Sequence, residues 1–337
     1  MPNLRYFTRV LHGMRFKKLN QMLRVVKDKS GHCKVRTLCD MAWCALRYGA
    51  GYYDYVMYGF YDMNGRQRDT YLTRLRNKKV CDLMNQAGSS DEFDDKLRFN
   101  VRFAGFLQRE TLNAELASAD ELSGFLQRHP VFLAKPNRGT CGNGIERLEA
   151  AQFASTSDCA EYLAEKHLNV LEEPLAQHEQ MARLHPQSVN TLRIVTDRVG
   201  DTVHIAYIVL KIGRGGSFCD NSGQGGVICR VDAGSGKICS VATDDYFEIF
   251  ETHPDTGIRF EGYRLPMVPE AIALAKRAAL VVPEIRHVGW DVAITPQGPV
   301  LIEGNDYPGT DLCQLAPHYP EKQGLWPYYK KILNLKK

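Results

Sequence analysis

The chain has 337 residues, of which 44% are hydrophobic and 24% are charged, and this composition excludes a collagen-like or wholly disordered protein. Lysine and arginine number 43 against 39 acidic residues, and the resulting net charge of +4 does not indicate a nucleic-acid-binding protein. An apolar run of about 18 residues and the apolar core of a signal peptide are both missing from the sequence, so we expect a cytoplasmic protein.

The first 40 residues are strongly basic, with ten lysine or arginine residues and two aspartates. Leu19, Met22, Leu23 and Val26 recur at helical spacing, which predicts amphipathic helices. The basic charge has two interpretations. It forms a surface for anionic lipid or a phosphorylated substrate, as in a peripheral membrane protein, or it belongs to helices with solvated basic faces. The second interpretation is favoured, because such charge is common on helix surfaces.

Residues 48–61 are rich in tyrosine, and we expect most of these aromatic rings to lie in the core. The polar segment 88–95 is predicted to be a loop at a domain boundary. From about residue 130 the pattern changes to short β-rich runs. The run 131–136 predicts a strand, and 157–168 predicts a helix capped by one of its first two residues, Ser157 or Asp158.

The second half of the chain alternates between strand pairs and helices. Residues 169–175 predict a strand, followed by a short helix or loop through residue 184. Three antiparallel pairs are predicted at 190–213, 225–243 and 290–305, and an amphipathic helix is predicted at 269–284. Antiparallel pairs with flanking helices predict an α+β fold.

A glycine-rich segment follows Lys135, with Gly139, Gly142 and Gly144 around Thr140. Glycine lets backbone N–H groups approach phosphate oxygens, and lysine adds a positive charge. The spacing differs from a Walker A loop, and no helix follows as a dinucleotide-binding fingerprint requires. By itself the segment is equally well interpreted as a phosphate-binding turn or as a glycine-rich hairpin without a ligand.

Asp291, Glu303 and Asn305 form the clearest candidate metal site. Glu303 and Asn305 are two residues apart on one predicted strand, so they point to the same face, and Asp291 can face Glu303 across the antiparallel pair. Oxygen-bearing side chains suit Mg²⁺. Two carboxylates among apolar neighbours repel each other and are costly to bury without a cation. A magnesium site is therefore favoured over two solvated carboxylates.

Two further segments carry candidate binding residues. Glu172 and Glu173 precede a proline, and a strand that runs into such a segment exposes backbone groups able to bind a purine edge. Acids on an exposed loop are the other interpretation. Arg193 lies among apolar residues, where it needs an anionic partner, in a functional site or in a structural ion pair.

Taken in chain order, these segments resemble the ATP-grasp superfamily, and most closely its sugar-transfer-associated family. The resemblance rests on six phrases, YGFYDMN (58–64), DKLRFN (95–100), AKPNRGTCGNG (134–144), SVNTLRIVT (188–196), DNSGQGG (220–226) and GWDVAITPQGPVLIEGN (289–305). It implies two α+β subdomains that grip ATP, with a helical N-terminal region. The implied divisions are a helical substrate-side region (1–85), a lid subdomain with the glycine loop (86–185), a core subdomain with the magnesium site (186–325) and a tail (326–337).

The resemblance also implies residue roles. Catalytic roles fall to Arg193, Lys211 and Arg214. The nucleotide would be bound by Lys96, Lys135, Thr140, Gly142, Gly144, Glu172, Glu173, Leu175 and, at the ribose, Glu179. Mg²⁺ would be held by Asp291, Glu303 and Asn305.

The implied activity is ATP-dependent ligation of a carboxylate to an amine through an acyl phosphate, with ATP and Mg²⁺ as cofactors. The substrate would be a small molecule or a sugar-linked carboxylate, in a polysaccharide, peptide or other natural-product setting. The alternative is a kinase on the same scaffold, which phosphorylates a hydroxyl and stops there. No nucleic-acid partner is expected.

Overall fold

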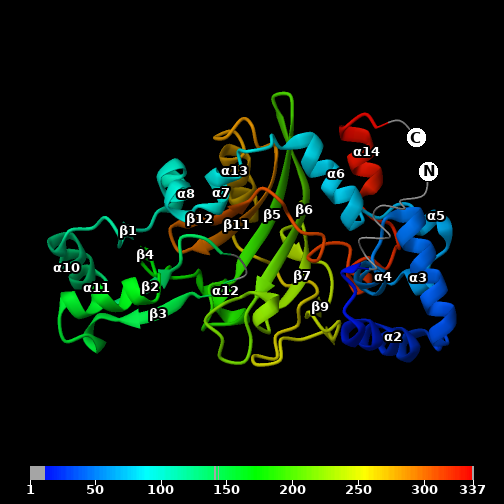
Figure 1. Ribbon diagram of the computed structural model, residues 1–337, viewed down its shortest axis with the longest axis horizontal. Coiled ribbons are helices and arrows are strands. Elements are labelled where there is room, and N and C mark those ends of the chain that lie inside the picture. The colour runs from blue at the N-terminus through cyan, green and yellow to red at the C-terminus, as the bar shows by residue number, and fades with distance from the viewer. Residues whose placement is uncertain (1–11, 140–141, 143, 336–337) are drawn as a thin grey trace.

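The computed structural model, which describes residues 12–139, 142 and 144–335, contains two β-sheets, a larger one in the middle of the molecule and a smaller one toward the left-hand end of Figure 1. The larger sheet has eight strands in the order β10-β9-β7-β6-β5-β11-β12, with β8 paired to β7. Its strands are β5 (Thr191–Val199), β6 (Thr202–Ile212), β7 (Val227–Asp232), β8 (Lys237–Ile238), β9 (Ala242–Thr243), β10 (Ile249–Phe250), β11 (His287–Thr295) and β12 (Gly298–Asn305). The pairings in this sheet are antiparallel. The predicted α+β class is confirmed.

The three predicted strand pairs are the hairpins of this sheet. β5 and β6 turn through residues 200–201, β7 and β8 turn around Gly234, and β11 and β12 turn at residues 296–297. Gly200 adopts a φ of 59° in the first turn, a conformation that glycine reaches without strain. Asn190 precedes β5, so it is free of the strand alternation that governs Arg193.

Alternation along the large sheet separates a core face from the opposite face. Leu192 and Ile194 of β5 lie in the largest hydrophobic cluster, together with Ala271 and Leu274 of helix α13 (Val268–Ala278). Arg193, between them in sequence, points to the other face. Helix α13 occupies the first part of the predicted 269–284 helix. It therefore covers one face of the sheet and leaves the other for charged residues.

The smaller sheet has the order β1-β4-β2-β3 and is also antiparallel. Its strands are β1 (Thr111–Asn113), β2 (Val131–Lys135), β3 (Glu146–Glu149) and β4 (Val170–Glu172), and helices α10 (Ala119–Arg128) and α11 (Thr156–Glu165) pack with it. Helix α11 is capped by Ser155, whose Oγ accepts a hydrogen bond from the Asp158 N–H at 3.1 Å. The predicted cap at Ser157 or Asp158 is wrong, because the helix begins earlier and both residues lie in its first turn.

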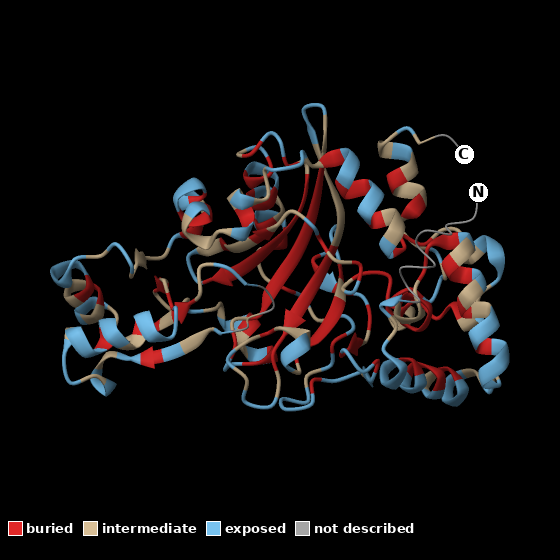
Figure 2. Ribbon diagram, in the orientation of Figure 1, coloured by how far each residue is buried: buried red, intermediate tan, exposed pale blue. Residues whose placement is uncertain are grey.

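Helices make up the N-terminal region, at the right-hand end of Figure 1. They are α2 (Phe16–Ser30), α3 (Lys34–Tyr48), α4 (Tyr52–Met57), α5 (Gly65–Arg68) and α6 (Arg74–Met84). The predicted apolar stripe of α2 is buried, as are Tyr55 and Tyr58 of the tyrosine-rich segment. These residues share a hydrophobic cluster with Ile228 of β7, so the helical region packs onto the large sheet. Figure 2 shows these buried positions in red on the inner sides of the helices.

The segment predicted as a polar loop contains a short helix instead. Helices α7 (Asp91–Asp94), α8 (Lys96–Arg102) and α9 (Ala104–Leu107) follow one another here. The Phe93 and Phe103 rings pack on Trp290 of β11, with centroids 5.8 and 5.5 Å apart. Burial of the Phe93 side chain against Trp290 stabilises helix α7 in a segment whose other residues are mostly polar.

Helices α7 to α9 and α12 (Glu179–Leu184) thus contribute to the core of the large sheet. The small sheet itself spans residues 111–172, and the wider limits 86–185 stay a prediction.

The C-terminal helix α14 (Trp326–Ile332) packs against α6 through a cluster that includes Val80, Met84 and Tyr329. Tyr328, in the same helix, donates a hydrogen bond to Oδ2 of the fully buried Asp197 at 2.9 Å. His287 forms a hydrogen bond with Oδ1 of the same carboxylate at 2.6 Å. Across the described ranges, none of the helices has the length and apolar character needed to cross a membrane.

We expect Tyr328→Phe to lower the free energy of unfolding by about 2 kcal/mol, because it leaves one oxygen of a buried carboxylate without its donor. Urea titration followed by circular dichroism measures the change. Tyr246→Phe is the matched control, since the Tyr246 side chain is 68% exposed. Equal midpoints for the two variants would contradict the role given to the Asp197 contact.

Candidate functional site

A cavity lies between the two sheets, lined by residues of β2, β4, β5, β6, β11 and β12 and of the connecting loops. A smaller cavity adjoins it and shares Lys96, Lys135, Glu172 and Glu303 with it. The predicted site residues that line the larger cavity are Lys96, Lys135, Gly142, Glu172, Glu173, Leu175, Lys211, Asp291 and Glu303, and Asn305 lines the smaller one. The structure therefore gathers in one place residues that are up to 209 positions apart in the sequence.

Asp291 lines the cavity and is the centre of a buried charge cluster. Strand register sets Asp291 opposite Arg193 on one side and opposite Glu303 on the other. The Arg193 guanidinium binds both Asp291 oxygens, the Nη2 contact measuring 2.9 Å, and Lys211 Nζ lies 2.9 Å from Oδ2. Burial alone would raise the pKa of Asp291, but the two cations outweigh it and hold that pKa well below its usual range. The carboxylate is therefore anionic at neutral pH.

Glu303 lies next to a β-bulge on β12. Asp291 pairs with Glu303, and the next residue, Val292, pairs with Leu301. Ile302 therefore has no partner on β11 and is the extra residue of the bulge. Ile302 and Glu303 both line the larger cavity, although neighbours in a regular strand point to opposite faces. Burial, followed by the charge of Asp291, raises the pKa of Glu303. A cation bound here would relieve both effects.

The described residues fit Mg²⁺ on chemical grounds. Among them no cluster of three or more His, Cys, Asp or Glu could hold a metal with protein ligands alone. Mg²⁺ commonly binds one or two carboxylates together with substrate phosphates. Within the described residues, Glu303 has no ion pair of the kind that Asp291 has, and the Asn305 Nδ2 is buried without a hydrogen-bond partner. Phosphate oxygens could accept from that amide.

Charge balance supports the same conclusion. The described lining of the larger cavity contains four basic and five acidic side chains. The basic ones are Lys96, Arg109, Lys135 and Lys211, and the acidic ones are Glu172, Glu173, Asp220, Asp291 and Glu303. The lining therefore carries no excess positive charge of its own. A triphosphate would need additional positive charge, which a divalent cation would supply.

A second charge cluster joins the small sheet to the large one. Glu172 Oε2 accepts from Lys135 Nζ at 2.6 Å and from Arg109 Nε at 3.2 Å. The other nitrogens of Arg109 donate to the backbone oxygens of Leu301 (2.6 Å) and Ile302 (3.2 Å) on β12. Burial opposes ionisation of Glu172, but the two cations prevail and lower its pKa to about 2.

Lys96 and the glycine loop lie at the mouth of the cavity. Lys96 Nζ donates to the Gly139 oxygen at 2.9 Å, and burial lowers the pKa of this lysine. The Gly142 oxygen accepts from Gln224 Nε2 at 3.0 Å, and a Cβ atom at Gly142 would lie 2.5 Å from the Asn221 amide nitrogen. Glycine is thus required where the loop approaches residues 221–224. Thr140 lies outside the described residues.

Four predicted site residues lie outside the described lining of the two cavities. One is Arg193, which reaches the site only through its ion pair with Asp291. Glu179 stands at the exposed start of α12 and pairs with Arg183 at 2.6 Å. Arg214 pairs with Asp244 at 2.9 Å and lies over the Phe250 ring. Gly144 packs near Pro136 beside the lining. The resemblance that assigned roles to Glu179 and Arg214 took no account of these local ion pairs.

Arg109 and Thr191 belong to the site although the sequence analysis did not assign them. Arg109 stands in no motif, so no sequence signal could have found it. Thr191 belongs to the Asn-Thr-Leu-Arg phrase, and its Oγ1 donates to Asp220 at 2.5 Å. Asp220 in turn lies 3.7 Å from Lys211.

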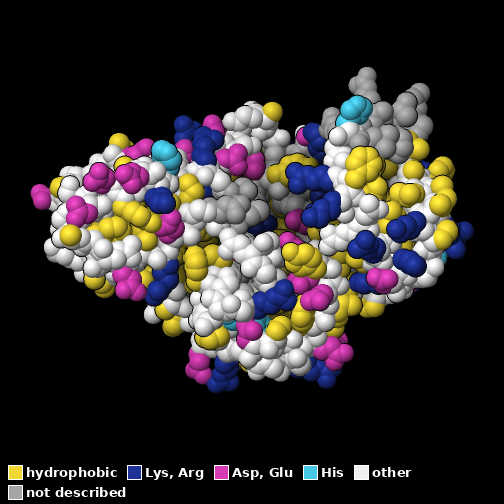
Figure 3. All heavy atoms as spheres, turned by 60° about the horizontal axis from the view of Figure 1, so that its bottom comes forward, with side chains coloured by type: hydrophobic (Ala, Val, Ile, Leu, Met, Phe, Trp, Pro, Cys, Tyr) yellow, Lys and Arg dark blue, Asp and Glu magenta, His cyan; other side chains and the backbone are white. Residues whose placement is uncertain are grey.

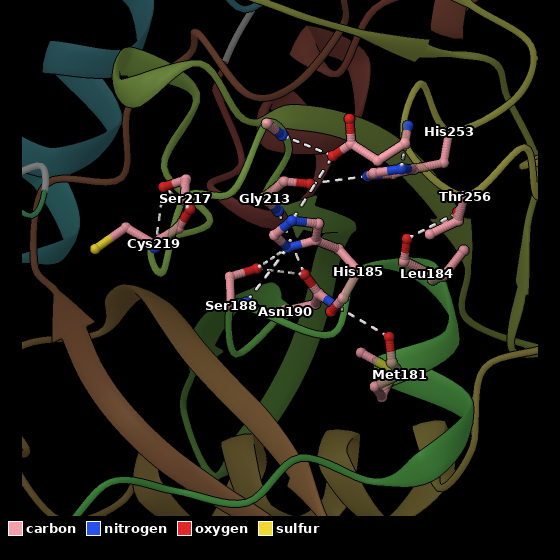
Figure 4. A network of polar contacts seen from close by, with 12 residues as sticks. Met181, Leu184, His185, Ser188, Asn190, Gly213, Ser217, Cys219, His253 and Thr256 are labelled. Atoms are coloured by element: carbon pink, nitrogen blue, oxygen red, sulfur yellow. Dashed lines mark hydrogen bonds and ion pairs between the residues drawn. The ribbon is translucent and has the colours of Figure 1, made fainter. Parts of the chain in front are cut away.

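A buried hydrogen-bond network holds the strand ends that carry Thr191 and Lys211 (Figure 4). The Asn190 Oδ1 accepts from Ser188 Oγ at 2.9 Å and from the Gly213 N–H at 3.3 Å. His253 hydrogen-bonds the Gly213 oxygen at 2.8 Å. The residue before β5 and the residue after β6 are therefore fixed to each other, next to the strand ends that carry Thr191 and Lys211.

The pKa of Glu172 predicts a pH-dependent contribution to stability. Because the folded value is about 2 and the usual value is 4.5, the contribution is complete above pH 4.5 and disappears as the pH falls toward 2. We expect Glu172→Gln to cost about 3 kcal/mol at pH 7, because it leaves two buried cations without their shared carboxylate. The difference from the wild type should shrink between pH 4.5 and 3.

Urea unfolding at pH 7, 4 and 3 measures this difference. Glu165→Gln, at the exposed end of α11, is the control and should follow the wild type throughout. A constant difference across this pH range would contradict the ionised state of Glu172.

Known proteins provide two kinds of match, solved structures and a family model. A search of curated proteins found no match. Solved structures with similar folds include the ATP-grasp ligase PsnB complexed with a minimal precursor (12% identity, 80% of this chain and 70% of that one, TM-score 0.45). D-alanyl-alanine synthetase A from Vibrio cholerae is similar over 74% of this chain and 66% of that one, at 11% identity and a TM-score of 0.45.

The chain thus spans about two thirds of the length of these two proteins. The model of the family described as "Sugar-transfer associated ATP-grasp" matches residues 75–333, which is most of the chain. The chain belongs to the sugar-transfer-associated ATP-grasp family.

Proposed function

We propose that this protein is an ATP-dependent ligase that joins a carboxylate to an amine through an acyl phosphate. The observation that carries the proposal is the row Glu303–Asp291–Arg193, with Lys211 beside it. Glu303, Asp291 and Lys211 line a cavity between the two sheets, and Arg193 is held next to them by Asp291. Its lining has no excess positive charge, which suits a nucleotide that arrives with a divalent cation. Family membership supports the same assignment.

In this proposal the nucleotide lies between the sheets. Lys96 and Lys135 contact the phosphates and the adenine edge, and the glycine loop with Gly142 covers the phosphates. Leu175 and Glu173 border the adenine. Glu172 holds Lys135 in place through the 2.6 Å ion pair.

Asp291, Glu303 and Asn305 would hold Mg²⁺, which would offset charge on the phosphate oxygens when bound. Arg193 and Lys211 are positively charged groups fixed beside them by Asp291. Fixed cations stabilise the charge that develops on a transferred phosphoryl group, because they need no reorganisation during the reaction.

The chemistry proceeds in two balanced steps. A substrate carboxylate oxygen attacks the γ-phosphorus of ATP, the bond from that phosphorus to the bridging oxygen breaks, and ADP leaves. The amine nitrogen then attacks the acyl carbon, phosphate leaves with the electron pair of the carbon–oxygen bond, and the nitrogen loses a proton. A closed glycine loop would keep water from the acyl phosphate between the steps.

The family description motivates a sugar-linked or cell-surface polysaccharide carboxylate as the substrate class, beside peptide-type carboxylates. A cytoplasmic location, where ATP is supplied, belongs to the same proposal.

The first experiment measures ADP release with Mg²⁺ across a panel of amino acids, uronic acids and nucleotide sugars, with hydroxylamine added to trap an acyl phosphate. Carboxylate-dependent ADP release with a hydroxamate product is the expected result. ADP release with hydroxyl acceptors and no hydroxamate would establish a kinase instead.

We expect Glu303→Gln to lower ADP release by on the order of 100-fold or more, because the amide keeps the shape of the side chain and removes its charge. Glu270→Gln is the matched control, since Glu270 is exposed on α13 and remote from the cavity. Circular dichroism checks that both variants are folded. Turnover of Glu303→Gln within a few-fold of the control would exclude Glu303 from the metal site.

A further inference from the structure

Helix α3 has two apolar faces, and only one of them is buried. Met41, Cys44, Ala45 and Tyr48 face the interior. On the opposite side, positions 35, 38, 39, 42, 43 and 46 recur at helical spacing and carry only apolar or cysteine side chains. In this outer stripe Val35 is 71% exposed, Leu38 40% and Trp43 57%. A solvent-facing helix surface is normally polar, so the outer stripe needs an explanation.

Positive charge borders the outer stripe. Lys34, Arg36 and Arg47 are exposed on α3 itself. The adjoining helix α2 presents further exposed cations, Lys17, Arg24 and Lys27, and begins with Phe16, whose side chain is 75% exposed. Figure 3 shows dark blue and yellow side chains next to one another at the right-hand end of the molecule, over these helices.

Acidic residues do little to offset this charge. From residue 12 to residue 48 there are nine lysine or arginine residues and two aspartates. One of the two, Asp40, is bound by Arg68, whose Nη1 and Nη2 atoms each lie 2.7 Å from one carboxylate oxygen. A second copy of the chain docked on the same face would bring two cationic surfaces together. The charge therefore favours an anionic partner over self-association.

We propose that α2 and α3 form a docking surface for a membrane rich in anionic lipid. Exposed Trp, Phe and Leu side chains bordered by Lys and Arg are the combination that binds the headgroup boundary of a bilayer. The contact is a surface contact, since none of the described helices could span a bilayer. It lies at the end of the molecule away from the small sheet, so it leaves the cavity open (Figure 1). The inference does not depend on the ligase activity.

Tryptophan fluorescence provides a selective measurement. Of the three tryptophans in the chain, Trp290 is fully buried, Trp326 is 8% exposed and Trp43 is 57% exposed. With vesicles of phosphatidylglycerol and phosphatidylcholine that carry brominated acyl chains, we expect emission from Trp43 to shift to the blue and to be quenched. Pure phosphatidylcholine vesicles should give little change, and 0.5 M salt should reverse the binding because surface charge is screened.

Co-sedimentation of the full chain with the same vesicles tests the residues. The double variant Lys34→Gln, Arg36→Gln should bind about thirtyfold more weakly. The matched control, Lys276→Gln with Arg277→Gln on exposed positions of α13, should bind like the wild type. Trp43→Ala should weaken binding, whereas Leu116→Ala, at an 82% exposed position, should not.

Several results would overturn the proposal. They are no binding to anionic vesicles at low salt, equal binding by the Lys34/Arg36 and Lys276/Arg277 variants, or a dimer in solution that Trp43→Ala dissociates. The last result would show that the surface is an interface between copies.

Discussion

The requirement that a buried charge be neutralised organises this structure. Asp291 lies among apolar strands, and it is stable there because Arg193 and Lys211 bind its two oxygens. Those contacts need β11 between β5 and β12, and they need Arg193 in register with Asp291. The strand order and the register together place the side chains of that one cluster in contact.

A second neutralised charge joins the two sheets. Glu172 belongs to the small sheet and pairs with Arg109. The same arginine donates hydrogen bonds to backbone oxygens of β12, the nearer of which is one residue from Glu303 in the sequence. Movement of the small sheet relative to the large one would therefore disturb the surroundings of Lys135 and of Glu303 together. In the proposed ligase, this would couple nucleotide binding to the geometry at the phosphates.

The sequence predicted what depends on local pattern. Alternating strands, turn residues and helical spacing gave the hairpins, the buried stripe of α2 and the tyrosine-rich core, and the family model confirms the ATP-grasp resemblance. Contacts made across the fold were beyond it. Arg109 gains its contacts only when β4 and β12 meet, and Phe93 is buried only when α7 meets Trp290. Glu179 forms an ion pair with Arg183 one helical turn away, and its place at the ribose stays a prediction. The roles of the site residues stay predictions.

The bulge at Ile302 lets the length of β12 vary without loss of the pair formed by Asp291 and Glu303. Ile302 is the extra residue, and the pairing on both sides of it is that of a regular antiparallel hairpin. Loss of one residue between Pro299 and Ile302 would remove the bulge, and Glu303 would still stand opposite Asp291 on the same face of the sheet. A relative one residue shorter in this hairpin could therefore keep both carboxylates on the cavity side.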